Sequence, residues 1–366
     1  PHCAGSCLYF MNQTPTDKSV ALLLQRLQSI SGNCLIVADE NWANVNWQMA
    51  QSSEQRNIVV LSNRYDISQN ALAANIDISF NDFDFSALEP HSFDSLLFRV
   101  SKERASSHHV INQAAKLLKP NGQLLLTGEK NDGLKTYVKQ ACKLFSDKTA
   151  AEKHGAHYLA SVQLHDTDQP PLDDKNYSQT RPIKDLSLDS KPGIFGWEKI
   201  DRGSAFLIEH LPQFLTRHIT APKTLLDLGC GYGYLSAQAS SYGFTQIVAT
   251  DNNAAALIAT AINFQRLEIN SQVVAGDAGD QINQRFDMVL CNPPFHQGFS
   301  IDGDMTVKFL SAAKRLLANT GQALFVVNNF IPLEHKAKDY FRYIEVLANS
   351  GSFKLVALSQ QEPKRD

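Results

Sequence analysis

The chain has 366 residues, of which 43% are hydrophobic and 19% are charged, and its formal net charge is −3. This length suits two domains with their own cores, and the composition is that of an ordinary globular protein. The sequence contains no run of about 18 apolar residues and no N-terminal secretory pattern, so we expect neither a membrane span nor export. Six scattered cysteines favour a reducing, cytoplasmic compartment, and their spacing predicts no metal site.

A net charge of −3 does not exclude a nucleic-acid partner, because phosphate binding requires only a local basic patch. Two segments are locally basic. One contains Lys130, Lys135, Lys139, Lys143, Lys148 and Lys153, and the other contains Arg181, Lys184, Lys191, Lys199 and Arg202. A solvated helix face with a polar linker and a phosphate-binding surface both fit this pattern.

Both halves of the chain alternate short apolar runs with helical patterns, which predicts parallel α/β sheets. Expected strands of the first half are Cys34–Ala38, Asn57–Leu61 and Ser92–Leu97. They align in order with Thr224–Leu228, Gln246–Thr250 and Arg285–Leu290. A fourth pair of segments, Ala115–Gln123 and Ala313–Gln322, aligns with one extra residue in the second copy. The sequence therefore predicts an internal duplication.

The first copy lacks the residues that could form a ligand site. Its first strand leads into Asp39–Asn44, which contains no glycine, so the backbone cannot approach a ligand closely. The end of its third aligned strand reads Phe98–Lys102 in place of an Asn-Pro-Pro-Phe stretch. We expect the first domain to keep the fold without a cofactor site.

A polar, turn-rich segment at residues 165–174 separates the two copies. We therefore expect a first domain at residues 11–160, a linker at 161–190 and a catalytic domain at 191–360.

The second copy has a glycine loop directly after its first strand, with Gly229, Gly231 and Gly233 in alternating positions. Glycines permit a tight turn and close contact between the backbone and a ligand. Asp227 precedes this loop, where its carboxylate can meet a cationic amino group. Tyr234 takes the position where the dinucleotide pattern has glycine or alanine, which counts against a nicotinamide dehydrogenase.

Two further acids end the next two expected strands. Asp251 can accept hydrogen bonds from both hydroxyls of a ribose, and Asp277 can accept one from an adenine amino group. A single aspartate of this kind is usually a helix cap or a surface turn residue. Three acids at three successive strand ends instead predict a nucleoside-type cofactor.

The stretch Asn292–Phe295 follows the expected strand Phe286–Cys291. Two successive prolines end the strand, because they fix φ and remove two N–H donors. The Asn292 side chain and nearby carbonyls can then accept hydrogen bonds, and Phe295 offers a flat apolar face. This arrangement suits a planar NH₂ group. We expect Cys291 to be a buried strand residue, not a nucleophile.

The glycine loop, the strand-end acids and Asn292–Phe295 together resemble class I S-adenosylmethionine-dependent N-methyltransferases. The blank first copy and residues 192–204 make the chain similar to the bacterial ribosomal RNA small subunit methyltransferase C family. The large-subunit methyltransferase G family shares this plan. The resemblance implies an α/β protein of two tandem Rossmann-like class I methyltransferase domains. It further implies S-adenosyl-L-methionine as cofactor and guanine-N2 methylation of 16S ribosomal RNA by a cytoplasmic monomer, with the assembled small subunit as partner.

The resemblance also implies roles for individual residues. The cofactor-binding set is Asp201, Asp227, Gly229, Gly231, Gly233, Asp251, Asn252, Asp277, Ala278 and Asn292. In catalysis, Asn292 and the Pro293 carbonyl would hold the target amine, and Phe295 would stack on the base. The alternatives are a 23S ribosomal RNA guanine, a protein glutamine or a DNA adenine as acceptor, and a non-catalytic ribosome-binding factor.

Overall fold

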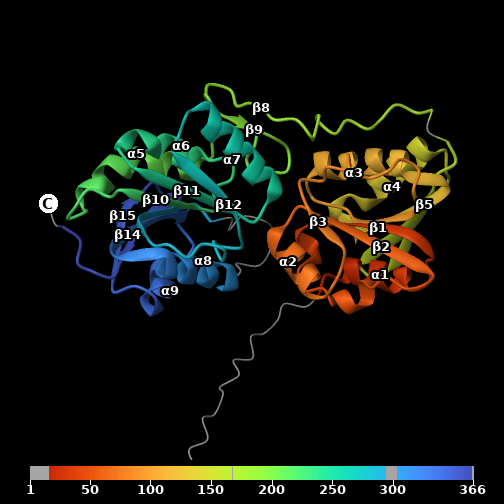
Figure 1. Cartoon of the computed structure of the whole chain (residues 1–366), viewed down its shortest axis with the longest axis horizontal. Coiled ribbons are helices and arrows are strands. Elements are labelled where there is room, and N and C mark those ends of the chain that lie inside the picture. Colours follow the sequence, from red (N-terminus) through yellow and green to blue (C-terminus); the bar gives the residue numbers. More distant parts are fainter. Residues whose placement is uncertain (1–15, 167, 294–302, 365–366) are drawn as a thin grey trace, which may run out of the picture.

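The computed structural model describes residues 16–166, 168–293 and 303–364. Within these residues two domains lie next to each other, joined by an extended segment (Figure 1). Each contains a seven-stranded sheet, with strand orders β3-β2-β1-β4-β5-β7-β6 and β12-β11-β10-β13-β14-β16-β15. Corresponding strands occupy corresponding places in the two sheets, which confirms the predicted tandem Rossmann-like fold and the internal duplication.

The first domain begins with α1 (Lys18–Leu27) and contains strands β1 to β5 in parallel, followed by the antiparallel β7. Its strands are β1 (Gly32–Ala38), β2 (Arg56–Ser62), β3 (Ile78–Phe80), β4 (Phe93–Arg99), β5 (Leu118–Glu129), β6 (Glu152–His154) and β7 (His157–Gln163). Its other helices are η1 (Glu40–Trp42), η2 (Trp47–Ala50), α2 (Tyr65–Ala73), α3 (Arg104–Leu117), η3 (Lys130–Asp132) and α4 (Leu134–Phe145).

The linker contributes a two-stranded ladder of β8 (Arg181–Pro182) and β9 (Asp189–Ser190). The second domain has strands β10 (Thr224–Leu228), β11 (Gln246–Asp251), β12 (Ser271–Ala275), β13 (Phe286–Cys291), β14 (Leu317–Asn328), β15 (Tyr343–Asn349) and β16 (Phe353–Ser359). Its helices are α5 (Arg202–Thr216), α6 (Tyr234–Ala239), η4 (Ser240–Tyr242), α7 (Ala254–Arg266), α8 (Gly303–Leu316), α9 (Leu333–Lys336) and η5 (Ala337–Asp339). The expected division at residues 160 and 190 stays a prediction; β7 of the first sheet continues to Gln163.

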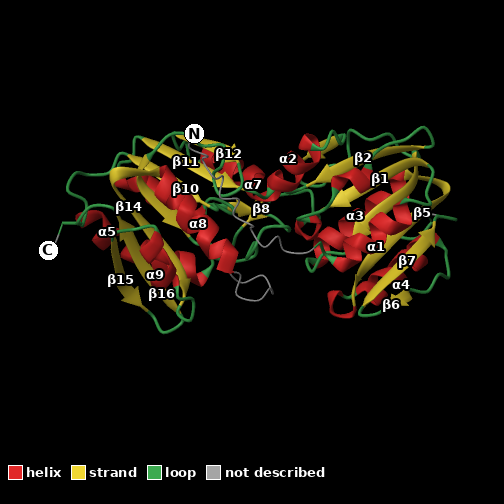
Figure 2. Ribbon diagram, turned by 90° about the horizontal axis from the view of Figure 1, so that it is seen from below, coloured by secondary structure: helices red, strands yellow, loops and turns green. Residues whose placement is uncertain are grey.

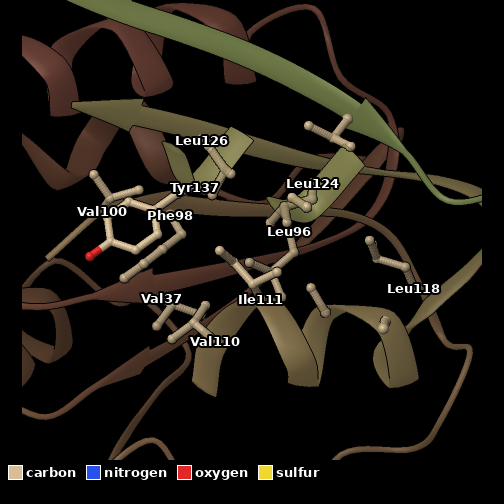
Figure 3. Close-up of a cluster of buried hydrophobic side chains, with 14 of the residues drawn as sticks. Val37, Leu96, Phe98, Val100, Val110, Ile111, Leu118, Leu124, Leu126 and Tyr137 are labelled. Carbon is tan, nitrogen blue, oxygen red and sulfur yellow. The ribbon is translucent and has the colours of Figure 1, made fainter. Parts of the chain in front are cut away.

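Helices cover both faces of each sheet, so each domain has three layers (Figure 2). The central strands are therefore buried on both faces and have continuous apolar runs. Figure 3 shows this packing in the first domain, where Val110 and Ile111 of α3 lie against Leu96 and Phe98 of β4. All four side chains are fully buried. No helix within the described ranges is long and apolar enough to span a membrane.

The strand registers correct the alignment expected between the two first strands. Cys34 pairs with Ser95, and Leu225 pairs with Met288. Ser95 and Met288 are counterparts, so Cys34 corresponds to Leu225 and not to Thr224. A shift by one residue exchanges the two faces of a strand, and the apolar runs of buried strands hide this shift in the sequence.

The registers also remove the extra residue expected in the second copy. Leu118 pairs with Phe93 in the first sheet, and Leu317 pairs with Phe286 in the second. Helices α3 and α8 both have 14 residues, and strands β5 and β14 both have 12. The Ala-Lys dipeptide common to both segments therefore misplaced the alignment by one residue.

The two domains contact each other through equivalent turns, those that follow β2 and β11. The Tyr65 N–H donates to the Asn252 carbonyl at 2.9 Å, and the Ala254 N–H donates to the Asn63 carbonyl at 3.0 Å. The two residues between these bonds pair as an antiparallel bridge. When the alignment of β2 with β11 is extended, Asn63 is the counterpart of Asn252 and Tyr65 that of Ala254. The contact therefore has the local symmetry of a two-fold interface between identical subunits.

Candidate functional site

The candidate site lies along one edge of the second sheet. Strands β11, β10 and β13 run parallel and are neighbours, and β12 extends the sheet beyond β11. Their carboxyl ends meet at the same edge, which is where open α/β sheets bind ligands. The glycine loop, the strand-end acids and Asn292 are thereby brought together, as the sequence predicts.

The glycine loop connects β10 to α6 with three left-handed residues. Gly229, Gly231 and Gly233 have φ values of +83°, +57° and +82°. A Cβ atom at Gly233 would lie 3.1 Å from the Thr260 side chain. At Gly231 the nearest atom would be Cγ2 of Ile194 at 4.0 Å. The backbone at Gly231 thus borders open space that a ligand can enter, because glycine alone leaves it uncovered.

Asp227 is fully buried beneath this loop. One of its carboxylate oxygens accepts bonds from the Ser236 N–H at 3.0 Å and hydroxyl at 2.7 Å. The other oxygen is buried and has no hydrogen-bond partner within the described residues. Burial raises the pKa of Asp227 to about 6. A buried acceptor without a donor fits a cationic amino group of a ligand.

Asp251, at the end of β11, holds the glycine loop in place. Its two oxygens accept bonds from the Gly231 N–H at 3.0 Å and the Asn253 N–H at 2.9 Å. Burial raises the pKa of Asp251, and the Arg64 guanidinium acts in the opposite direction. Arg64 belongs to the first domain and pairs with Glu40 at 3.2 Å. The first domain therefore places a positive charge near the acid expected to bind the ribose.

The structure places the Asn252 side chain in the contact between the domains. Its Nδ2 donates to Asp66 Oδ1 at 3.0 Å, and its Oδ1 accepts from the Asp66 N–H at 3.0 Å. Both groups of the amide are therefore engaged by the first domain. The role of Asn252 in cofactor binding stays a prediction.

Asp277 follows β12 and forms an ion pair with Lys308 of α8. Burial raises the pKa of Asp277, and Lys308 opposes this shift. The next residue, Ala278, has a φ of +48° and turns the chain away from the strand. An adenine amino group would share the Asp277 carboxylate with Lys308. Sequence reasoning missed this pairing, which requires the position of α8.

Asn292 follows β13 directly, and two neighbours orient its amide. Its Nδ2 donates to Asp201 Oδ2 and to Ser204 Oγ, both at 2.8 Å. Because both N–H groups face these acceptors, the amide oxygen faces the other way and can accept from a substrate. Asp201 also caps α5 by accepting from the Ser204 N–H at 2.8 Å. Asp201 thus contacts the predicted catalytic residue, and sequence reasoning missed Ser204.

Pro293 is buried and lies two residues after the end of β13. Pro294 and Phe295 lie outside the described residues, so the expected stacking role of Phe295 stays a prediction. Cys291 is fully buried, and its thiol donates to the Leu228 carbonyl at 3.1 Å. Its burial and its position in β13 confirm the expected buried strand residue, and burial raises the pKa of this thiol well above its usual value. Among the described residues, no three His, Cys, Asp or Glu side chains are grouped to hold a metal ion.

Two family models match the chain, the methyltransferase small domain at residues 185–357 and its N-terminal counterpart at residues 21–173. The ribosomal RNA small subunit methyltransferase C of Shewanella loihica is 25% identical over 330 residues, which are 83% of this chain and 94% of the relative. That of Shewanella halifaxensis is 27% identical over 288 residues, covering 77% and 81%.

A solved structure matches the whole arrangement. It is a T. thermophilus 16S rRNA N2 methyltransferase in complex with AdoMet and guanosine, with a TM-score of 0.80 and 20% sequence identity. The match covers 94% of this chain and 92% of that one. At this identity the likeness concerns the fold, and it includes both domains.

Proposed function

We propose that this chain methylates the exocyclic N2 amine of a guanosine in 16S ribosomal RNA, because it belongs to the family of methyltransferase small domain proteins that includes ribosomal RNA small subunit methyltransferase C. The methyl donor is S-adenosyl-L-methionine. The second domain is catalytic. The observation that carries the proposal is the Asn292 amide, which Asp201 and Ser204 orient beside the glycine loop.

The residues at the sheet edge fit this cofactor. Asp227 has a buried acceptor for the amino group, and Gly231 leaves the backbone uncovered. Asp251 would hold the ribose and Asp277 the adenine. When bound, S-adenosylmethionine supplies a methyl group activated by a sulfonium cation. The protein therefore has to position the acceptor and does not have to activate the donor.

The acceptor nitrogen is weak, because its lone pair is delocalised into the guanine ring. The Asn292 oxygen and the Pro293 carbonyl would each accept one N–H of the amine, which favours a pyramidal nitrogen and directs its lone pair toward the methyl group. Positive charge develops on the nitrogen during transfer, and two fixed carbonyl dipoles stabilise it. The proton leaves to water after transfer.

Asp201 and Ser204 supply the orientation on which this mechanism depends. A free amide could turn by 180° and present its N–H groups to the substrate, which would repel the target amine. Two acceptors on the nitrogen side exclude that orientation. We therefore assign Asp201 and Ser204 as positioning residues for Asn292.

The target guanine must leave its base stack to reach Asn292, so the substrate is a flipped or single-stranded nucleotide. Lys135, Lys139 and Lys143 are exposed and recur every four residues along α4, so they lie on one face of that helix. We assign this face to phosphate contacts with the small subunit. The protein acts in the cytoplasm. It acts as a monomer, because its two domains already form a symmetric contact within one chain.

The test is methyl transfer from labelled S-adenosylmethionine to separated ribosomal subunits and to their RNAs without protein, followed by nucleoside analysis. We expect label in N2-methylguanosine from 16S RNA. Label in N2-methylguanosine from 23S RNA would mean that the acceptor lies in the large subunit and that the reaction is the same. Label only in protein or DNA, with the cofactor bound, would overturn the RNA assignment.

A further inference from the structure

The first domain retains one acid of the cofactor site. Asp82 lies two residues after the end of β3, as Asp277 lies two residues after the end of β12. Strands β3 and β12 are the corresponding edge strands of the two sheets. The residues that follow, Phe83 and Ala278, share the left-handed conformation, with φ values of +50° and +48°. Asp82 is therefore the counterpart of the acid expected to bind adenine.

This acid is engaged by the chain itself. The Tyr177 hydroxyl of the linker donates to Asp82 Oδ1 at 2.8 Å, and Lys191 forms a buried ion pair with Oδ2. The Tyr177 ring is fully buried and is stacked against His109, with centroids 4.7 Å apart and planes 23° apart. It is also stacked against Phe83 at 6.4 Å. The Tyr177 ring is planar, donates a hydrogen bond to Asp82 and stacks on neighbouring rings. These are the interactions that an adenine would form at this position.

The same linker continues from this position to the active loop. Lys191 is followed within three residues by Gly193 and Ile194. A Cβ atom at Gly193, whose φ is +94°, would lie 2.8 Å from the Tyr177 hydroxyl oxygen. The Gly193 carbonyl accepts a hydrogen bond from Asn253 Nδ2 at 2.7 Å, and Asn253 lies two residues after Asp251, the acid expected to bind the ribose.

Ile194 completes the connection. It packs in one buried cluster with Tyr232 of the glycine loop, and it is the nearest side chain to the uncovered backbone of Gly231. Residues 191–194 thus run from the former adenine position of the first domain to the glycine loop of the second, where Ile194 would form one wall of a cofactor site.

We propose that Asp82, Tyr177 and Lys191 form a positioning cluster, in which the former adenine position of the first domain anchors the Gly193–Ile194 wall of the active cofactor pocket. The proposal rests on the proposed function, because that function makes the pocket a cofactor site. The first domain would then contribute to cofactor affinity without touching the cofactor.

The cluster is sensitive to single substitutions. Asp82 is 5% exposed and Lys191 is 3% exposed, so each charge depends on the other. Removal of one member of a buried pair leaves an unpaired charge without solvent. Tyr177→Phe is the milder change, because it removes the hydroxyl that bonds to Asp82 and keeps the stacked ring.

The test compares three variants by calorimetric titration with S-adenosylmethionine and by thermal unfolding. We expect Tyr177→Phe and Lys191→Met to weaken cofactor binding by about five- to ten-fold. Lys191→Arg should retain most of the affinity, because it keeps the charge. In methylation assays the KM for S-adenosylmethionine should rise while kcat stays near that of the wild type, a division that a loss of folded protein would not produce.

Lys119→Met is the matched control, since it breaks an ion pair with Asp94 in the same domain, remote from the linker. It should leave cofactor affinity unchanged. If Tyr177→Phe remains folded and binds the cofactor as tightly as the wild type, the positioning role is wrong, even if Lys191→Met fails to fold. If the wild-type protein itself binds no S-adenosylmethionine, the proposed function fails first, so the two failures are distinguishable.

Discussion

The two domains have the same strand order, yet they carry different side chains at the position of Asn292, the asparagine proposed to be catalytic. Arg99 is the counterpart of Asn292. Arg99 is the last residue of β4, and Asn292 directly follows the last residue of β13. Arg99 pairs with Asp17, the residue that caps α1, at 3.3 Å. Asn292 bonds to Asp201, which caps α5. The acid is therefore retained in both copies, and only its partner differs.

That difference is a physical reason to expect no methyl transfer in the first copy. A guanidinium has donors and no acceptor, so Arg99 cannot hold an amine. It is fixed further by Asp132 at 2.8 Å. The first strand end is changed as well, since Asp39 is buried there without the glycines, and burial raises its pKa to about 7. The fold therefore tolerates these exchanges, whereas the proposed chemistry depends on a few side chains at one edge of the sheet.

Removal of the Asn292 amide from the second domain should have the largest effect on activity. We expect Asn292→Ala to reduce kcat by about 10²- to 10³-fold, because the acceptor that stabilises the developing charge is lost. Cofactor affinity should remain, and unfolding should change little, because Asn292 is only half-buried. Single-turnover methylation together with calorimetry measures both quantities. Wild-type turnover in this variant would remove Asn292 from the mechanism.

Substitution of Arg99, the counterpart of Asn292, should lower the free energy of unfolding and should not affect methyl transfer. Arg99→Met leaves Asp17 and Asp132 without their cation, which is expected to lower the free energy of unfolding by about 3 kcal/mol. Urea denaturation monitored by fluorescence measures this loss. A stability equal to that of the wild type would show that Arg99 is dispensable to the first domain.

A third substitution makes the active copy resemble the silent one at the ribose position. Ser62 ends β2 where Asp251 ends β11. We expect Asp251→Ser to weaken S-adenosylmethionine binding by about 10- to 100-fold, because charge-assisted hydrogen bonds contribute about 1.5–3 kcal/mol. Calorimetric titration gives the dissociation constant. An unchanged value would overturn the ribose assignment.

We also expect cofactor affinity to depend on pH, with a smaller effect than the substitutions above. Burial raises the pKa of Asp227 above its ordinary 3.8 to about 6. Its stability contribution is therefore complete below about pH 3.8 and is lost as the pH rises through 6. Binding of a cationic amino group requires the ionised form, so cofactor affinity should fall as the pH drops below about 6. Titrations at pH 5 and 8 test this, and Asp227→Asn should remove the difference.

The sequence predicts the tandem fold and the strand Phe286–Cys291 correctly, because buried parallel strands have a strong apolar pattern and proline ends them sharply. The sequence also predicts that Asp227, Asp251 and Asp277 lie at one edge of the second sheet, because the carboxyl ends of parallel strands meet there. These features depend on local residue patterns.

Features that depend on pairs of distant residues could not be predicted. Composition gives the linker the pattern of a solvated segment, although Tyr177 is fully buried and Lys191 is paired with Asp82. Asn252 follows Asp251, which is predicted to bind the ribose. Only the position of the first domain shows that Asp66 forms hydrogen bonds with the Asn252 side chain. A polar residue in a sequence does not indicate which remote group satisfies it.

The symmetric contact between the turns after β2 and β11 has a consequence for how the protein responds to dilution. A dimer held by the bonds of Asn63, Tyr65, Asn252 and Ala254 would dissociate as its concentration fell. Here both partners belong to one polypeptide, so the contact forms at a local concentration set by the linker and is independent of the amount of protein in the cell. The protein thereby keeps the contact between its two domains at any concentration.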